Sequence, residues 1–144
     1  MNTDVLSTLT GMTIKDPRSV IDQGYVGSDP LTANCLIRTF EVHSICRGVV
    51  LAVEQEPKYN HWCVTVEVDS RRWVRYRSLA SAKVKAGQTV TKDTFIGYGY
   101  KGMVRFEYCT DQQSQFPVRI LEKQLYKQDP SPVLFGTENL GEVS

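Results

Sequence analysis

Between residues 41 and 108, short runs of alternating polar and apolar residues are separated by turns that contain glycine or aspartate. This alternation is typical of strands with one buried face, because successive side chains of a strand point to opposite sides. Strands are predicted at 41–46, 48–53, 63–68, 73–76, 95–99 and 103–108. Short strands at close spacing indicate an antiparallel sheet, sandwich or barrel, so the chain is predicted to be mainly β.

The segments on either side of this region are predicted to lie outside the core. Residues 1–31 form an N-terminal arm, in which Asp16-Pro17 and the later Gly24 predict a short capped helix. The β domain is predicted at 32–135; within it, 118–125 fits either a strand or a helix, and the prolines at 130 and 132 interrupt regular structure. Residues 136–144 are a polar C-terminal tail.

Composition excludes some classes of partner. A chain of 144 residues with 41% hydrophobic content can bury a core without metal or disulfides. A net charge of +1 argues against a nucleic-acid coat protein and gives no reason to expect a membrane partner. The N-terminus lacks the pattern of a secretory signal, so the chain is expected either to be cytosolic when made or to be delivered by a non-secretory route. The cysteines form no Cys-x-x-Cys pair and are predicted to be buried or semi-buried reduced thiols: Cys35, Cys46, Cys63 and Cys109. Their spacing does not decide between free thiols and a disulfide between two of them.

Several short motifs follow one another in an order known from one enzyme family. They are Tyr76-Arg77-Ser78-Leu79, then the segments at 84–90, 95–99, 102–107 and 129–134. Together they resemble the lysostaphin/LytM-type metallopeptidase domain, a β-sheet zinc fold that cleaves peptide cross-links in bacterial cell walls. The resemblance covers about residues 39 to 135. It implies an antiparallel β-sheet or sandwich of the LytM type, preceded here by a short helical arm.

The resemblance also locates the family's catalytic positions, and other residues occupy them. Ser78 stands at a catalytic histidine, and Met103 and Arg105 stand at the two histidines of a His-x-His motif. The stretch from Thr32 to Arg38, where an earlier ligand pair is expected, contains no histidine and no carboxylate. A guanidinium stays protonated and offers a metal no lone pair. The sequence therefore predicts no catalytic zinc, no cofactor and no peptidase activity.

A different metal or nucleophile site has less support. His43 lies on an alternating strand and His61 is placed in a loop, and a lone histidine is more often a packed or solvent-facing side chain than a ligand. Cys35, Cys46 or Cys63 could meet a histidine to hold zinc or form a nucleophilic pair, but their spacing carries no motif.

Arg75 and Arg77 share one face of their strand, which is either a solvated face or a contact for an anion or partner. Tyr76 and Glu107 are further candidate groove or partner contacts. Arg105 and Glu107 also share a face and are expected to pair, closing the former active site. Four aromatic residues either line a groove or fill the core: Tyr98, Tyr100, Phe106 and Tyr108.

A retained fold without its catalytic residues indicates use as a building block. Small LytM-like proteins resemble parts of phage tails, so the leading hypothesis is a non-catalytic structural component of a phage or phage-derived tail or baseplate. Its expected partners are other tail or baseplate subunits, with no nucleic acid and no membrane, and its location is the virion. One alternative is a zinc-free regulatory or binding module acting on cell-wall hydrolases or peptidoglycan. Another is an enzyme with zinc held by cysteine and histidine.

Overall fold

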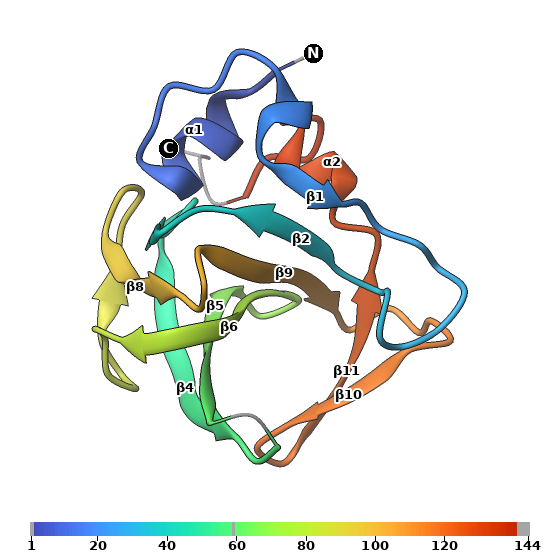
Figure 1. Ribbon diagram of the computed structural model, residues 1–144. Helices are drawn as coiled ribbons and strands as arrows, with labels where there is room; N and C mark the ends of the chain where they lie inside the picture. The colour runs from blue at the N-terminus through green and yellow to red at the C-terminus, as the bar shows by residue number, and fades with distance from the viewer. Residues whose placement is uncertain (1, 59, 141–144) are drawn as a thin grey trace.

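The computed structural model describes residues 2–58 and 60–140 and is built mainly of strands (Figure 1). The strands are β1 (Ile21–Gln23), β2 (Cys35–Arg38), β3 (Glu41–His43), β4 (Gly48–Glu56), β5 (His61–Asp69), β6 (Arg72–Ala82), β7 (Thr89–Val90), β8 (Phe95–Gly99), β9 (Met103–Thr110), β10 (Pro117–Ile120) and β11 (Lys123–Gln128). The α-helices are α1 (Asp4–Thr10) and α2 (Ser131–Leu134), and Pro17–Ser19 forms a 3₁₀ turn. The prediction of a mainly β, antiparallel fold is confirmed.

The strands form one sheet whose main path runs β1-β2-β9-β6-β5-β4-β7. The hairpin β10–β11 joins it through β9, and the pair β3–β8 joins it through β6. Every pairing between described strands is antiparallel. The central strands β6 and β9 therefore have neighbours on both sides, which fixes the direction of each of their side chains.

The two faces of β6 and β9 meet different surroundings. One face supplies Val74, Tyr76, Val104 and Phe106 to the main apolar core, which α1 and α2 help to cover. The opposite face carries charged residues and borders a smaller apolar cluster of Ala52, Trp73, Cys109, Ile120 and Leu125. In Figure 1 the two helices lie together at the top, while the β10–β11 hairpin lies at the lower right.

The N-terminal segment belongs to the core, contrary to the prediction of a peripheral arm. Leu6 and Leu9 of α1 are fully buried in the main cluster, and Ile21 of β1 packs against it. The helix predicted after Asp16 is only the 3₁₀ turn, although Asp16 caps it by accepting a 3.0 Å hydrogen bond from the Arg18 backbone N–H. Pairing with β2 converts the following residues into a strand, so tertiary contacts override the local signal.

The C-terminal region is also more regular than predicted. The ambiguous segment 118–125 is a hairpin, and α2 forms where interruption was expected, because Pro132 lies in the first turn of the helix, where no N–H is needed. The described part of the predicted tail packs on the body, since Leu140 is buried in the main core. Residues 141–144 lie outside the described residues. Neither α-helix of the described chain has the length and apolarity needed to cross a bilayer.

Tight turns set the register around the central strands. Lys101 and Gly102, between β8 and β9, both have positive φ, at 53° and 73°, which suits a two-residue hairpin turn. A Cβ on Gly99 would lie 2.6 Å from the carbonyl oxygens of Met103 and Thr39, so only glycine allows this approach. Asp69 closes the β5–β6 turn by accepting a 2.9 Å hydrogen bond from the Arg71 N–H.

Candidate functional site

The candidate site lies on the charged face of β6 and β9. The antiparallel register sets Arg75 opposite Glu107 and Arg77 opposite Arg105. These four residues alternate with core residues along the two strands, so they share the face that points away from the main core. The structure thus brings together the arginines and the glutamate that the sequence placed on common faces.

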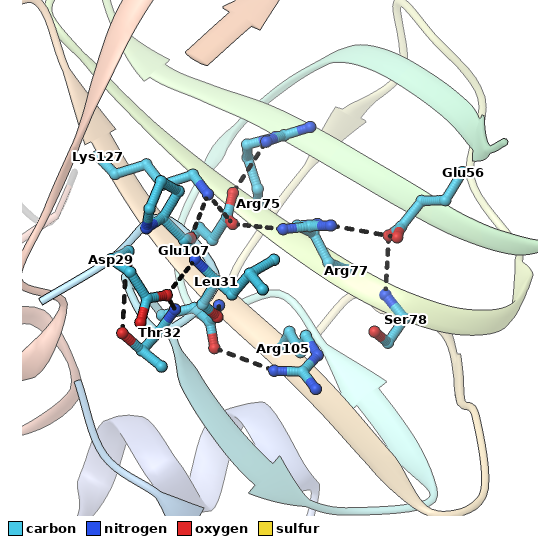
Figure 2. Close-up of polar contacts among 12 residues, drawn as sticks. Asp29, Leu31, Thr32, Glu56, Arg75, Arg77, Ser78, Arg105, Glu107 and Lys127 are labelled. Carbon is cyan, nitrogen blue, oxygen red and sulfur yellow. Dashed lines mark hydrogen bonds and ion pairs between the residues drawn. The ribbon is translucent and has the colours of Figure 1, made fainter. Parts of the chain in front are cut away.

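Glu107 is the centre of an ionic cluster and is fully buried (Figure 2). Its Oε1 accepts a 2.8 Å hydrogen bond from Arg75 Nη1, and its Oε2 accepts one of 2.7 Å from Arg77 Nη1. Lys127 Nζ, from β11, lies 3.0 Å from Oε2. Three cations therefore share one carboxylate. Glu107 can be buried in its charged form because these contacts replace the hydration that it loses.

The electrostatics of Glu107 follow from two opposing effects. Burial alone would raise the pKa of its carboxyl group, but the charges of Arg75, Arg77 and Lys127 together outweigh burial and lower that pKa. Burial alone would lower the pKa of Arg77, but its contacts with the carboxylates of Glu107 and Glu56 outweigh burial and raise that pKa. Glu107 and Arg77 therefore stay charged throughout the neutral range.

A second carboxylate extends the cluster toward Ser78. Glu56, at the end of β4, accepts 3.2 Å hydrogen bonds from Arg77 Nη2 and from the Ser78 backbone N–H. Ser78 has a φ of 62°, in the left-handed region, and its carbonyl accepts a 2.9 Å hydrogen bond from the Tyr100 N–H. Glu56 thus connects the central arginine to a strained position on β6.

The expected pairing of Arg105 with Glu107 is wrong. Both Glu107 oxygens are already engaged by cations from neighbouring strands, and Arg105 instead donates a 3.5 Å hydrogen bond to Asn34 Oδ1. The reason is register: the residue directly opposite Glu107 is Arg75, while Arg105 lies two residues along the same strand.

The three positions that resemble family catalytic positions do not fit zinc. They hold the hydroxyl of Ser78, the thioether of Met103 and the guanidinium of Arg105, whereas a catalytic zinc site needs three nitrogen, oxygen or thiolate ligands with lone pairs. Among residues 2–58 and 60–140, no group of three or more His, Cys, Asp or Glu side chains is arranged to hold a metal.

The cysteines and histidines do not supply a replacement. All four cysteines are free and buried, as predicted. Burial raises the pKa of the Cys63 thiol to about 11 and that of Cys109 to about 12, which disfavours the thiolate needed for metal binding or nucleophilic attack. His61 begins β5 rather than lying in a loop, and its ring is 4.0 Å from that of Tyr100. His43 contacts Glu41 Oε1 and the Asp93 carbonyl, each at 3.2 Å.

Tyr76 is not at the site, contrary to the prediction of a groove or partner contact. It is fully buried on the opposite face, where its hydroxyl accepts a 3.1 Å hydrogen bond from the Ile45 N–H. Of the four aromatic residues with two open interpretations, Phe106 and Tyr108 are buried in the core, whereas Tyr98 and Tyr100 are exposed.

Three participants were missed from the sequence: Glu56, Lys127 and Asn34. Lys127 had a usable signal, because it follows buried Leu125 at a spacing of two and so points to the same side of a strand. A lysine on the inward face requires a partner carboxylate. Glu56 and Asn34 had no such signal, since each lies at the edge of a strand beside a loop.

Comparison with models of known protein families identifies a matching family. The profile of Peptidase family M23 matches residues 36–116. A search of curated protein sequences gave no significant match.

Solved structures with the same fold include three of interest here. The antimicrobial peptidase lysostaphin from Staphylococcus simulans has a TM-score of 0.60 and 22% identity, over 86% of this chain and 53% of that chain. The catalytic domain of the prophage-encoded M23 protein EnpA from Enterococcus faecalis has a TM-score of 0.55 and 15% identity, over 65% and 82%. A chain of the SpoIIQ–SpoIIIAH pore-forming complex has a TM-score of 0.52 and 21% identity, over 64% and 76%. The chain spans 53% of this lysostaphin chain and 55% of the lysostaphin chain in a solution structure, but 88% of the lysostaphin catalytic domain.

Proposed function

This chain belongs to peptidase family M23, and from that premise we propose that it is a non-catalytic structural component of a phage or phage-derived tail or baseplate. In this role the LytM-like fold is an assembly module. Its partners are other tail or baseplate subunits, and its place is the virion, after assembly in the host cytoplasm.

The observation that carries the non-catalytic part is the chemistry at the former ligand positions. Arg105 brings a permanent positive charge to a position where the family has a zinc-binding histidine, so it opposes a metal cation instead of binding it. The nearby carboxylate of Glu107 is engaged by three cations and has no oxygen left for a metal. Substitution of one residue would therefore not restore the site.

Two similar structures support the assembly part. The fold occurs in a prophage-encoded protein, EnpA, and in a complex of two proteins, SpoIIQ and SpoIIIAH. The first fact is consistent with a phage origin for this chain, and the second with a role in binding partner proteins.

Elemental analysis tests the non-catalytic part. The purified chain, refolded or expressed with excess zinc and then dialysed, is expected to retain far less than one zinc per chain. Lysostaphin treated in parallel is the positive control. Zinc at one equivalent would overturn the proposal.

Particle fractionation tests the assembly part. In lysates of the producing phage or prophage, the chain is expected to sediment with tail proteins on a density gradient, in a fixed ratio to them. A chain that stays at the top of the gradient, while tails sediment normally, would contradict a structural role in the particle.

A second candidate is a zinc-free module that binds cell-wall hydrolases or peptidoglycan. The observation in its favour is the exposure of Phe40, Tyr98 and Tyr100, since large exposed aromatic side chains often mark contact surfaces. Enrichment of a wall hydrolase, or retention on purified peptidoglycan, by the wild-type chain but not by a Phe40→Ala/Tyr98→Ala variant would favour it.

A further inference from the structure

We propose that Arg105, supported by the charge of Arg77, is a binding site for a carboxylate supplied by an acidic side chain of a neighbouring protein subunit. The source of the carboxylate rests on the proposed function. The chemistry of the site rests on the arrangement of charges alone.

Two positive charges lie directly opposite each other on β6 and β9. Arg77 on β6 and Arg105 on β9 are cross-strand partners, and like charges at such positions destabilise a sheet. Arg77 is compensated by Glu107 and Glu56, at 2.7 and 3.2 Å. Within the described chain, no carboxylate lies within ion-pair distance of Arg105.

The cluster around Glu107 and Arg105 has more cations than carboxylates. Four cations, Arg75, Arg77, Arg105 and Lys127, share it with two carboxylates, Glu56 and Glu107. Both carboxylates are already occupied, so positive charge remains in excess in a half-buried setting. An excess of this kind is relieved by an external anion more effectively than by water, because the local dielectric is low.

The Arg105 guanidinium is available for a further contact. A guanidinium has five N–H donors, and Arg105 donates one long bond, to Asn34 Oδ1 at 3.5 Å. In the described chain, no buried side-chain nitrogen lacks a hydrogen-bond partner. The other Arg105 nitrogens have no acceptor within the described chain, so they are not buried and reach solvent. Asn34 is held in turn by donating a 2.9 Å hydrogen bond to the Leu31 carbonyl, which limits where the guanidinium can turn.

The geometry of a guanidinium selects the ligand class. Its planar fork makes two parallel hydrogen bonds to a carboxylate or a phosphate, and Arg105 has the donors for such a pair. An acidic segment of a partner subunit would place a carboxylate beside Arg105, and its negative charge would balance the guanidinium without a further bound ion. Free phosphate shares the chemistry and is separated from a protein carboxylate by experiment.

Nuclear magnetic resonance of the arginine Nε–Hε groups tests the site. The full chain is titrated at constant ionic strength with sodium acetate, with sodium phosphate, and with the peptide acetyl-Gly-Glu-Gly-Glu-Gly-amide. The same peptide with glutamine in place of glutamate is the neutral probe. The variants are Arg105→Gln and, as a matched control, Arg119→Gln, which removes an exposed arginine on β10.

We expect saturable shifts of the Arg105 signal with acetate and with the glutamate peptide, and none with the glutamine peptide. Both variants retain Arg77, the cross-strand partner of Arg105, so its Nε–Hε signal reports binding in each of them. Read from this signal, binding is expected to weaken at least about tenfold in Arg105→Gln and to be unchanged in Arg119→Gln, because the charge-assisted hydrogen bonds are lost only in the former. Amide spectra of both variants confirm that they are folded.

Shifts of the Arg77 signal that grow linearly with ligand concentration, without saturation, and are equal in both variants would overturn the site. Saturation by phosphate without saturation by acetate or peptide would overturn the carboxylate assignment. Failure of this titration leaves zinc content and particle sedimentation unaffected, so the inference and the proposed function fail separately.

Discussion

The two faces of β6 and β9 are made from the same backbone, yet they are held together in different ways. On one face Tyr76 and Phe106 are cross-strand partners whose rings lie 5.7 Å apart within the apolar core. On the other, Arg75 and Glu107 are cross-strand partners joined by a 2.8 Å ion pair. The first face is stabilised by burial, which depends little on pH, whereas the second depends on every charge of its network being present.

The two faces therefore respond differently to substitution. Apolar packing tolerates similar residues, because its contacts are non-directional. The ionic face is a set of coupled groups, since removing one charge leaves the others buried without a partner. Substitutions on the two faces are therefore expected to differ in the size, the pH response and the sign of their effects on stability.

The largest effect is expected on the apolar face. Phe106→Ala removes a fully buried ring and leaves a cavity, and it is expected to lower the free energy of unfolding by about 3–5 kcal/mol. Urea unfolding monitored by circular dichroism measures the change. Phe40→Ala, at a 77% exposed phenylalanine, is the control and should shift stability by less than about 0.5 kcal/mol. A similar loss in both variants would contradict the assignment of the core.

The next largest effect is expected for Glu107→Gln, which removes the negative charge at the centre of the ionic face. The amide leaves three buried or half-buried cations without a countercharge, so a loss of about 3 kcal/mol is expected at pH 7. Glu122→Gln, at an exposed position in the β10–β11 turn, is the matched control. A neutral result for Glu107→Gln would mean that the network contributes nothing to folding.

The pH response separates the two faces further. The pKa of Glu107 is lowered from its ordinary value of 4.5, so its contribution is present above that pH and is lost as the pH falls through the folded-state pKa. The gap in unfolding free energy between wild type and Glu107→Gln should therefore narrow in acid, while the gap for Phe106→Ala stays nearly constant. Equal narrowing for both variants would refute the comparison.

A smaller effect is expected at the polar atom of the apolar face. Tyr76→Phe removes the acceptor of the buried Ile45 N–H and should cost about 1–2 kcal/mol in thermal or urea unfolding. Tyr98→Phe, at an exposed hydroxyl, is the control. No loss at Tyr76 would show that another group replaces its hydroxyl.

The smallest effect has the opposite sign. Ser78 has a φ of 62°, so Ser78→Gly should relieve backbone strain and stabilise the chain by about 0.5–1 kcal/mol. Ser78→Ala keeps the Cβ and should give no gain. Stabilisation by alanine as well would assign the effect to the hydroxyl rather than to the backbone.

Much of the fold was readable from local pattern. The alternation along 73–76 and 103–108 predicted both central strands, and it placed Arg75 with Arg77 and Arg105 with Glu107 on common faces. The helix α1 was missed, because its seven residues carry only two buried leucines and a glycine stop. Hairpin β10–β11 was ambiguous, since a short mixed segment fits either state until it pairs.

The sequence by itself determined which side chains share a face and that the family's ligand positions lack metal-binding residues, because both depend only on residue identity and on the period of a strand. The tertiary structure decided which charges meet. The register sets Arg75, not Arg105, beside Glu107, and β11 brings Lys127 from 20 positions further along the chain. A carboxylate has two oxygens, and once neighbouring strands have occupied both, Arg105 is left facing solvent with its charge uncompensated within the described chain.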